Sequence, residues 1–373
     1  MVGLPKGFRV SAVSSGIKKE KKLDLGLIYS EVPCNAWGVF TTNKIQSASV
    51  KLTRENLKKR PPQALIINSG NANCFVGKKG IEDAKFITGL VAEGLRIPKE
   101  SVLISSTGII GRPLPVKKIE KSLGNLMRKL SRDSLGDLSL AILTTDKRPK
   151  VKGAKINIDN KVVKLVAVGK GAGMISPNLA TMLCFIITDA YISSSALREA
   201  LREVIRDSFN SITVDGCMST NDTVLILANG LAENRLIDLK SKNFSLFSGV
   251  LKELCLEMAK KIIEDAEGAT KFIRITVKGA NSKEEAKKIA LIIANSNLLK
   301  SAIYGEDRNL GRIISAIGQS KVNLREEDIK IKLSSLKKKR INLEVWVGEG
   351  DKTATIYTSD LSPEYVKINA SYN

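Results

Sequence analysis

The sequence of 373 residues contains no histidine. This absence excludes the Ser–His and Cys–His pairs that activate many enzymatic nucleophiles, and it excludes metal sites built on imidazole. A nucleophile in this chain must therefore obtain its base from a lysine, a carboxylate or an α-amino group. The absence of one residue type narrows the chemistry before any motif is considered.

Long apolar runs and a leader sequence are also lacking. No run approaches the ~18 apolar residues that a membrane helix needs. The first ten residues, MVGLPKGFRV, hold no apolar stretch typical of a secretory signal. The 5 cysteines are widely spaced and include no Cys-x-x-Cys pair, which predicts free thiols in a reducing compartment. We therefore expect a cytoplasmic protein with no membrane partner.

Aromatic residues are few, at 5% of the chain, although the formal net charge is +22. A basic surface can attract nucleic acid, so a basic nucleic-acid-binding protein is one alternative. The lysines, however, form short clusters spread along the chain, and no aromatic stacking signature accompanies them. We interpret the charge as a solvated surface and expect no nucleic-acid partner.

Apolar periodicity predicts alternating strands and helices. Strands are expected at 37–42, 64–68, 102–105, 140–145, 162–168, 182–188, 224–228, 272–277, 343–348 and 354–358. Helices are expected at 81–95, 116–130, 194–209, 244–264 and 282–294, the last with Ser282 and Glu285 at capping-box spacing. The order lacks strict βαβ alternation, which favours a layered α/β or α+β fold over a Rossmann fold or a barrel.

Four stretches of small polar residues and glycine lie at the ends of predicted strands. They are NSGNAN at 68–73, SSTG at 105–108, TTD at 144–146 and GKGAG at 169–173. Each alone is a common turn composition. Because a rigid sheet often positions functional loops at its strand ends, four such stretches in one chain predict a site there.

The last of these stretches continues as GKGAGMISPNLATMLCF, where one threonine, Thr181, stands at the mouth of an apolar strand. The segment contains neither a Walker A motif nor GxGxxG, so a phosphate site is not indicated. Glycine permits sharp bends and close backbone approach. The segment therefore has the composition of a chain that must bring its own backbone near another group.

The same segment resembles the self-cleaving region of the ornithine acetyltransferase (glutamate N-acetyltransferase) family of arginine biosynthesis. Further segments resemble that family in the same order along nearly the whole chain: WGVFTTNKIQSASV from Trp37, INSGNANC from Ile67, SSTGIIGRPLP from Ser105, ILTTDKRPK from Ile142, FNSITVDGCMSTNDTVLILANG from Phe209, EGATKF from Glu267, GRIISAIG from Gly311 and YVKINASYN from Tyr365. One such motif would be weak, whereas a co-linear series is specific.

The resemblance implies a precursor that cuts itself between Ala180 and Thr181. Residues 1–180 would form an α fragment, and 181–373 a β fragment whose C-terminal α/β region begins at about residue 270. Thr181 would become an N-terminal nucleophile whose own α-amine, with a reference pKa of roughly 7.7–8.0, serves as base. That arrangement explains how an enzyme of this kind works without histidine.

The resemblance also implies a reaction and a set of site residues. The acetyl group of N2-acetyl-L-ornithine would pass through Thr181 to L-glutamate, with Thr107 and the Gly108 backbone N–H stabilising the oxyanion. The implied substrate contacts, besides Thr181, are Thr144, Lys170, Glu267 and Asn369. Thr145 is the alternative to Thr144, because adjacent strand residues face opposite ways.

The implied fold is a layered αββα sandwich, like the DmpA/ornithine acetyltransferase fold, with a smaller C-terminal α/β domain. No metal and no cofactor are expected, and the resemblance leaves open whether acetyl-CoA is also a donor. Two copies of each fragment would assemble as α2β2. Family members carry a Ser or Thr five residues beyond the position of Asn369, whereas the printed sequence ends at Asn373.

One further enzyme class remains as an alternative. A related self-processing amidohydrolase or aminopeptidase would use the same nucleophile and oxyanion residues but pass the acyl group to water. Lys170 and Glu267 favour the transferase, because they suit a carboxylate and a side-chain ammonium.

Overall fold

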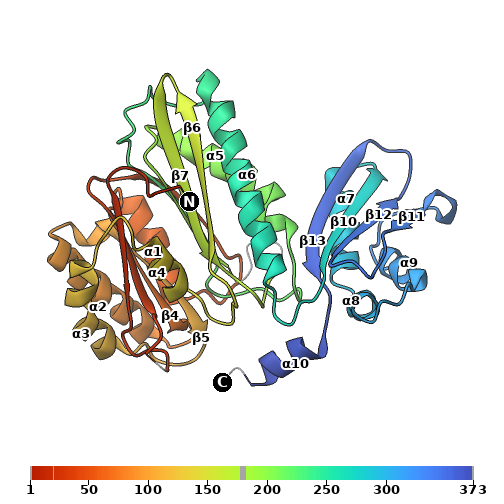
Figure 1. The fold of residues 1–373 in the computed structure, drawn as a ribbon, viewed down its shortest axis with the longest axis horizontal. Helices are drawn as coiled ribbons and strands as arrows, with labels where there is room; N and C mark the ends of the chain where they lie inside the picture. The colour runs from red at the N-terminus through yellow and green to blue at the C-terminus, as the bar shows by residue number, and fades with distance from the viewer. Residues whose placement is uncertain (1, 20, 177–181, 372–373) are drawn as a thin grey trace. The chain divides into compact units, whose positions relative to one another are not determined.

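The structure is a computed structural model that describes residues 2–19, 21–176 and 182–371 (Figure 1). Two compact units are present. The first takes in the described residues of 1–171, 178–209 and 218–258, and the second takes in those of 172–177, 210–217 and 259–373. Each unit has its own sheet structure and is described separately.

Two sheets build the first unit. One has the strand order β1 (Phe8–Val13), β2 (Leu25–Ser30), β4 (Ala64–Asn71) and β5 (Val102–Ile109). The other has the order β3 (Asn35–Phe40), β9 (Thr223–Ala228), β8 (Leu183–Thr188), β7 (Lys161–Lys170) and β6 (Lys150–Ile158). A shared core joins their inner faces, including Phe8, Leu65, Ile67 and Leu103 from one sheet and Val168, Phe185, Ile187 and Leu225 from the other.

The outer faces of both sheets are covered by helices. On the first sheet, α1 (Ala48–Lys59), α2 (Lys78–Leu95) and α3 (Val116–Arg128) bury a second core with Ile66, Val102 and Ile104. Along β4, Ile66 therefore faces the helices while its neighbours Leu65 and Ile67 face the other sheet, which is why the strand is apolar on both sides. The short helix α4 (Leu135–Ala141) lies instead on the inner side of this sheet, where it packs against β1 and β2 and its Leu138 joins the core shared by the two sheets.

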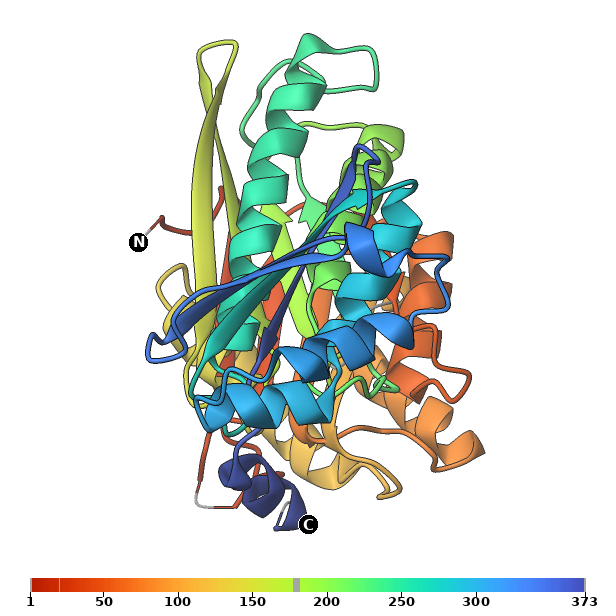
Figure 2. The ribbon, with the colours of Figure 1, turned by 90° about the vertical axis from the view of Figure 1, so that its right-hand side faces the viewer.

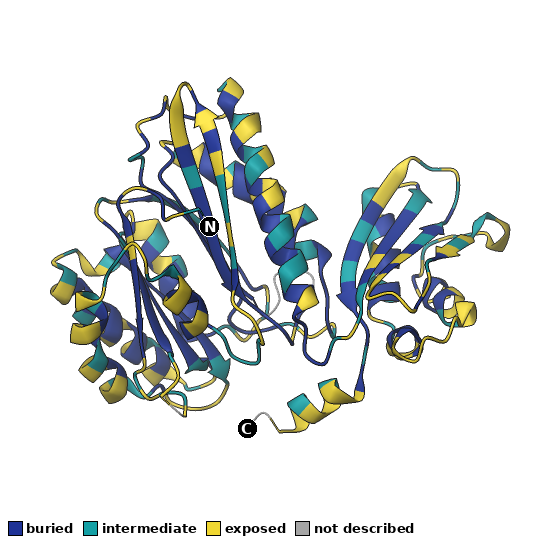
Figure 3. Ribbon diagram, viewed as in Figure 1, coloured by how far each residue is buried: buried dark blue, intermediate teal, exposed yellow. Residues whose placement is uncertain are grey.

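The second sheet is flanked by α5 (Ser194–Asp207) and the long α6 (Lys242–Glu264), which runs along it in both views (Figures 1 and 2). The Ser193 side chain caps α5 by accepting a hydrogen bond from the Ala196 N–H. The central strands β8 and β9 are buried throughout, whereas α6 carries exposed as well as buried residues (Figure 3). The layers of the first unit are thus helix, sheet, sheet, helix.

A smaller α/β arrangement forms the second unit. Its sheet has the order β11 (Lys330–Leu333), β12 (Arg340–Trp346), β10 (Phe272–Ala280) and β13 (Lys352–Ser359). Helices α7 (Lys283–Ala294), α8 (Asn297–Tyr304) and α9 (Leu310–Gly318) contribute to its core on one face, and α10 (Pro363–Ala370) follows β13. Ser282 accepts a bond from the Glu285 N–H, so the expected cap of α7 is present. The expected αββα fold with a smaller C-terminal α/β part is confirmed.

One predicted strand is wrong, and several elements were not predicted. The run 140–145 is not a strand, because α4 occupies 135–141 and buries Leu138 and Ala141, three residues apart, while Leu140 is exposed. Short apolar runs fit either structure. The elements without a sequence prediction are β1, β2, β6, β11, α1, α4, α8, α9, α10 and the 3₁₀ turns Lys99–Ser101, Phe209–Ser211 and Glu326–Asp328.

Two structural findings concern the cysteines and the helices. All 5 cysteines are free thiols, and four of them are buried. Among the helices that the structure describes, none combines the length and the apolar character needed to span a bilayer.

Candidate functional site

An unusually close backbone approach occurs where β4 and β5 end side by side. These parallel strands carry an irregularity at Gly70 and Asn71, opposite Thr107 and Gly108. Gly108 has φ +134°, and a Cβ there would lie 2.3 Å from the carbonyl carbon of Gly70 and 2.4 Å from the nitrogen of Asn71. Only glycine fits both the dihedral angle and the space. Thr107 precedes it with 4% of its surface exposed.

A buried polar network lies beneath this strand end. The Ser106 hydroxyl donates to the Asn68 side-chain oxygen at 2.6 Å and shares a 2.6 Å hydrogen bond with the Ser49 hydroxyl. The Asn221 side-chain amide donates at 2.7 Å to the carbonyls of both Ala72 and Ser106. Because buried polar groups held by several bonds have few alternative arrangements, this network makes the Thr107–Gly108 end of β5 rigid.

A second strand end, that of β7, places a buried lysine against the Thr144–Asp146 stretch. Lys170 is 3% exposed, and its Nζ donates to Thr144 Oγ1 at 3.0 Å. Asp146 Oδ1 accepts from Lys150 Nζ and from the Gly171 N–H, both at 2.7 Å. Burial alone would raise the pKa of Asp146, but the Lys170 and Lys150 ammonium groups outweigh it and lower the pKa to about 2. Asp146 thus remains charged and balances two buried cations.

Lys18 lies near both of these strand ends. Its Nζ lies 3.4 Å from the Ala141 carbonyl, which also accepts from the Ser69 hydroxyl beside the β4 irregularity. Burial lowers the pKa of Lys18 to about 8, a shift that Asp24 opposes and the Lys170 ammonium adds to. Lys18 was not predicted, because it stands in a lysine cluster interpreted as solvated surface. Its signal was the glycine immediately before Ile17, which marks a bend rather than a helix face.

The second unit holds a buried carboxylate against the glycine-rich segment. Glu267 is 7% exposed, and its N–H donates to the Ala172 carbonyl at 2.9 Å. The Asn369 side-chain amide of α10 donates to Glu267 Oε2 at 2.8 Å. A Cβ at Gly173 would lie 2.2 Å from that same oxygen. Gly173 therefore gives the Glu267 carboxylate the space it occupies.

The predicted residues fall into three groups. Within the first unit, Thr107 with Gly108 forms one group, and Thr144 with Lys170 forms another. Within the second unit, Glu267 and Asn369 are hydrogen-bonded. Ala180 and Thr181, and the terminal Asn373, lie outside the described residues.

The choice between Thr144 and Thr145 needs a different basis from the one used on the sequence. Both residues lie in an irregular bend rather than in a strand, so opposite strand faces do not distinguish them. The Lys170 ammonium donates to the Thr144 hydroxyl, and the choice of Thr144 over Thr145 stays a prediction.

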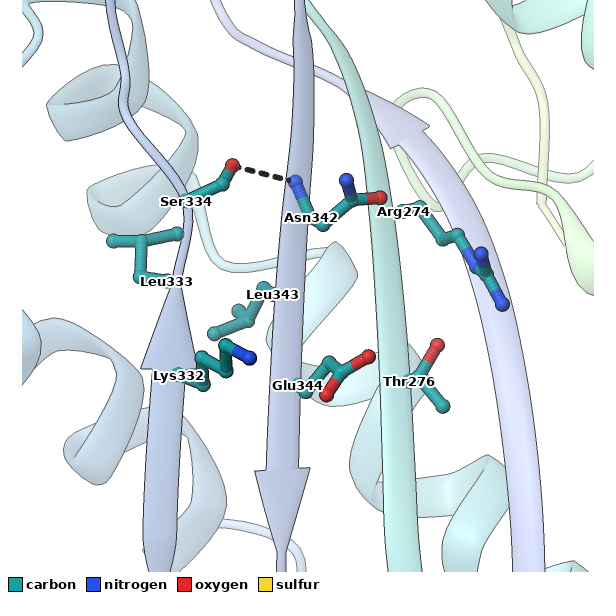
Figure 4. Close-up of a pocket in the computed structure, with 8 residues that line it drawn as sticks. All are labelled: Arg274, Thr276, Lys332, Leu333, Ser334, Asn342, Leu343 and Glu344. Carbon is teal, nitrogen blue, oxygen red and sulfur yellow. Dashed lines mark hydrogen bonds between the residues drawn. The ribbon is translucent and has the colours of Figure 1, made fainter.

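Groups that could hold a metal or a small molecule were sought elsewhere as well. Over residues 2–19, 21–176 and 182–371, no three His, Cys, Asp or Glu side chains are grouped so as to hold a metal ion. A cavity of about 290 Å³ lies on the face of the β10–β11–β12 sheet shown in Figure 4. It is lined by Arg274, Thr276, Lys332, Leu333, Ser334, Asn342, Leu343 and Glu344, none of which is a predicted site residue.

Comparisons with known proteins identify a family that matches most of the chain. The ArgJ family model matches residues 9–338. Arginine biosynthesis bifunctional protein ArgJ of Geobacter sulfurreducens is 42% identical over 98% of this chain and 99% of its own length. The protein of the same name from Caldanaerobacter subterraneus is 43% identical over 100% and 98%.

A solved structure matches in addition. That of arginine biosynthesis bifunctional protein ArgJ from Bacillus halodurans has 38% identity, covers 47% of this chain and 91% of its own, and gives a TM-score of 0.45. On the family model and the full-length relatives, this chain belongs to the ArgJ family.

Proposed function

We propose that this ArgJ-family enzyme is made as a precursor that cuts itself between Ala180 and Thr181. The Thr181 hydroxyl attacks the Ala180 carbonyl carbon, the C–N bond breaks, and the hydroxyl proton passes to the departing nitrogen. The product is an ester with a free Thr181 α-amine. Water then hydrolyses the ester, which leaves a carboxylate on Ala180 and restores the Thr181 hydroxyl.

The freed threonine then carries out acetyl transfer in two steps. Its Oγ attacks the acetyl carbonyl of N2-acetylornithine while its α-amine takes the hydroxyl proton and passes it to the leaving nitrogen. Ornithine leaves, and the acetyl group is held as an ester. The α-amine of glutamate attacks that ester, N-acetylglutamate forms, and the Thr181 hydroxyl is regenerated. An amide is exchanged for a similar amide, so no energy-rich cofactor is needed.

Each of these steps passes through a tetrahedral oxyanion, which needs donors already in place. Thr107 and the Gly108 N–H are assigned this role. Two features support the assignment. The approach of Gly108 to Gly70 and Asn71 permits no side chain, and the buried network around Ser106 fixes the strand end. Donors that do not reorganise during the reaction lower its barrier most.

The observation that carries the substrate assignment is the pair formed by the buried Lys170 and Thr144 in the first unit, and the buried Glu267 carboxylate of the second unit supports it separately. Lys170 is a buried cation bonded to Thr144, and Gly173, three residues later, accommodates the buried Glu267 carboxylate. A carboxylate complements the first of these charges, and an ammonium group complements the second. Lys170 and Thr144 would bind the α-carboxylate that both substrates share, and Glu267 with Asn369 would bind the ornithine ammonium.

Intact-mass spectrometry of freshly made protein tests the cleavage. Two fragments are expected, the second beginning at Thr181. Thr181→Ala should abolish both cleavage and transfer, whereas Thr181→Ser should retain some of each because serine keeps the hydroxyl and the α-amine. A folded wild-type chain that stays uncut contradicts the proposal.

Acceptor and donor assays distinguish the variants of this reaction. Transfer to glutamate is expected to dominate over release of free acetate, which a self-processing amidohydrolase would produce instead. Supplying glutamate with acetyl-CoA and measuring N-acetylglutamate determines whether acetyl-CoA is a second donor. For the mature enzyme we propose an α2β2 assembly, which light scattering after cleavage would test.

A further inference from the structure

The segment 171–182 connects β7 to β8, whose ends pair at Lys170 and Leu183. On its upstream side, the second unit holds two consecutive backbone N–H groups with one carboxylate. Asp215 Oδ2 accepts from the Met174 N–H at 2.7 Å, and Oδ1 accepts from the Ile175 N–H at 3.0 Å. Met174 has φ +55°, a left-handed conformation that is uncommon for a side chain of this size. Asp215 therefore bonds the segment at a residue with an uncommon backbone conformation.

Asp215 is itself fixed in direction. Its Oδ1 also accepts from the Cys217 N–H at 3.0 Å, and its Oδ2 accepts from the Tyr365 hydroxyl at 3.1 Å. Burial, together with the Asp215 charge, raises the pKa of Tyr365, so the phenol stays a donor. A carboxylate that receives four donors is an acceptor on both oxygens and has one preferred orientation.

On the downstream side, the first unit holds the residue that directly follows Thr181. The Met182 N–H donates to Asp222 Oδ1 at 2.8 Å, and the Met182 carbonyl accepts from the Thr223 N–H at 3.1 Å. Asp222 is 1% exposed and Met182 is also 1% exposed. The start of β8 is thus fixed by a side-chain bond before its regular pairing begins.

We infer that Asp215 and Asp222 are positioning residues for the self-cleavage, an inference that rests on the proposed function. Each carboxylate accepts backbone N–H groups on one side of the proposed cut, from residues 174–175 and from residue 182. Intramolecular attack needs the reacting atoms about 3–3.5 Å apart with a fixed direction of approach. Each carboxylate restricts the backbone conformations of the residues it bonds, close to the proposed cut. Neither aspartate donates or takes a proton in the reaction.

The experiment compares cleavage rates in matched aspartate variants. Full-length Asp215→Ala and Asp222→Ala chains are made by cell-free translation, and the uncut fraction is followed by intact mass. The controls are Asp189→Ala in the first unit and Asp360→Ala in the second. Both control residues are buried, at 1% and 3% exposure, and both accept two backbone N–H bonds, but not from residues 171–182.

Cleavage is expected to slow by about tenfold or more in each test variant, and by less than about twofold in the controls. Thermal midpoints are recorded for all four alanine variants. If an aspartate has only a structural role, its variant should cleave as fast as a control variant with the same thermal midpoint. Where an alanine variant shows no thermal transition, the asparagine variant replaces it. Asparagine keeps one acceptor oxygen, so Asp222→Asn should cleave faster than Asp222→Ala.

The possible failures are distinguishable. If the wild-type chain folds and stays uncut, the proposed function is wrong and the positioning role falls with it. If wild type is cut while Asp215→Ala and Asp222→Ala cleave as fast as Asp189→Ala and Asp360→Ala, the inference alone is overturned.

Discussion

Replacing Gly108 by alanine tests the rigid strand end that the proposed chemistry needs. The backbone at Gly108 has φ +134°, which costs a side-chain-bearing residue about 1–3 kcal/mol. The added Cβ would also lie 2.3 Å from the carbonyl carbon of Gly70. Since the neighbour is backbone, β4 and β5 must separate locally, and overpacking of this kind costs about 1–3 kcal/mol more. The total is roughly 2–6 kcal/mol.

In a unit of this size each kcal/mol shifts the thermal midpoint by about 2–4 °C, so Gly108→Ala should lower it by roughly 4–24 °C. Transfer activity should fall further, because displacing the neighbouring Thr107 by about 1 Å is enough to cost about 100-fold in rate. Differential scanning calorimetry and a coupled assay of ornithine release, both below the midpoint of the variant, measure the two effects.

Gly124→Ala is the matched control. Gly124 lies within α3, and a Cβ there would meet nothing within 4 Å. Alanine in place of an interior helical glycine stabilises by about 0.5–1 kcal/mol, so this variant should melt slightly higher and keep its activity. A Gly108→Ala protein with the melting point and transfer rate of wild type would refute the reasoning, because neither the dihedral angle nor the close approach would then matter.

Three further outcomes are expected. Lys170→Met should raise KM for both amino-acid substrates by about 10–100-fold, which corresponds to the loss of a charged hydrogen bond of about 1.5–3 kcal/mol. KM values equal to those of wild type in initial-rate kinetics would contradict this. Gly173→Ala should displace the Glu267 carboxylate, whose Oε2 lies 2.2 Å from the new Cβ position, and so raise KM for acetylornithine while leaving KM for glutamate nearly unchanged; a parallel rise in both opposes the assignment. Asp146 has its pKa lowered from 3.8 to about 2 in the folded chain, so its stabilising contribution is complete above about pH 4 and is lost as the pH falls towards 2; melting curves of Asp146→Asn should lack that part of the acid dependence shown by wild type.

The sequence predicted the strands with both faces buried more reliably than the short elements. The runs around Leu65, Leu103 and Phe185 are apolar at consecutive positions, because each strand lies between a sheet and a layer of helices. The run at 140–145 has the same composition but belongs partly to a helix. In so short a segment, the burial of Leu138 and Ala141 rather than residue type decides the structure.

For the site, the sequence indicated which stretches matter but not the charges that organise them. Lys170 and Thr144 were both predicted and do meet. The third partner, Asp146, was passed over beside two threonines, yet its carboxylate balances the buried Lys170 and Lys150. Asp215 lies about forty residues along the sequence from the backbone N–H groups that donate hydrogen bonds to it. Such long-range bonds leave no periodic signal, so they emerge only from the folded chain.

The pairing of β7 with β8 has a consequence for the enzyme after cutting. Six residue pairs, from Leu165–Thr188 to Lys170–Leu183, join strands that would belong to different fragments, and β3 with β9 adds a second such ladder. Separating the fragments would unzip two ladders and expose strands that are buried on both faces. In the precursor these strands pair within one chain, at a high effective concentration. Separated fragments would have to associate from dilute solution in a bimolecular step. We therefore expect the cut to produce two bands on a denaturing gel but one particle in native solution, with reassembly after full unfolding far slower than the original folding.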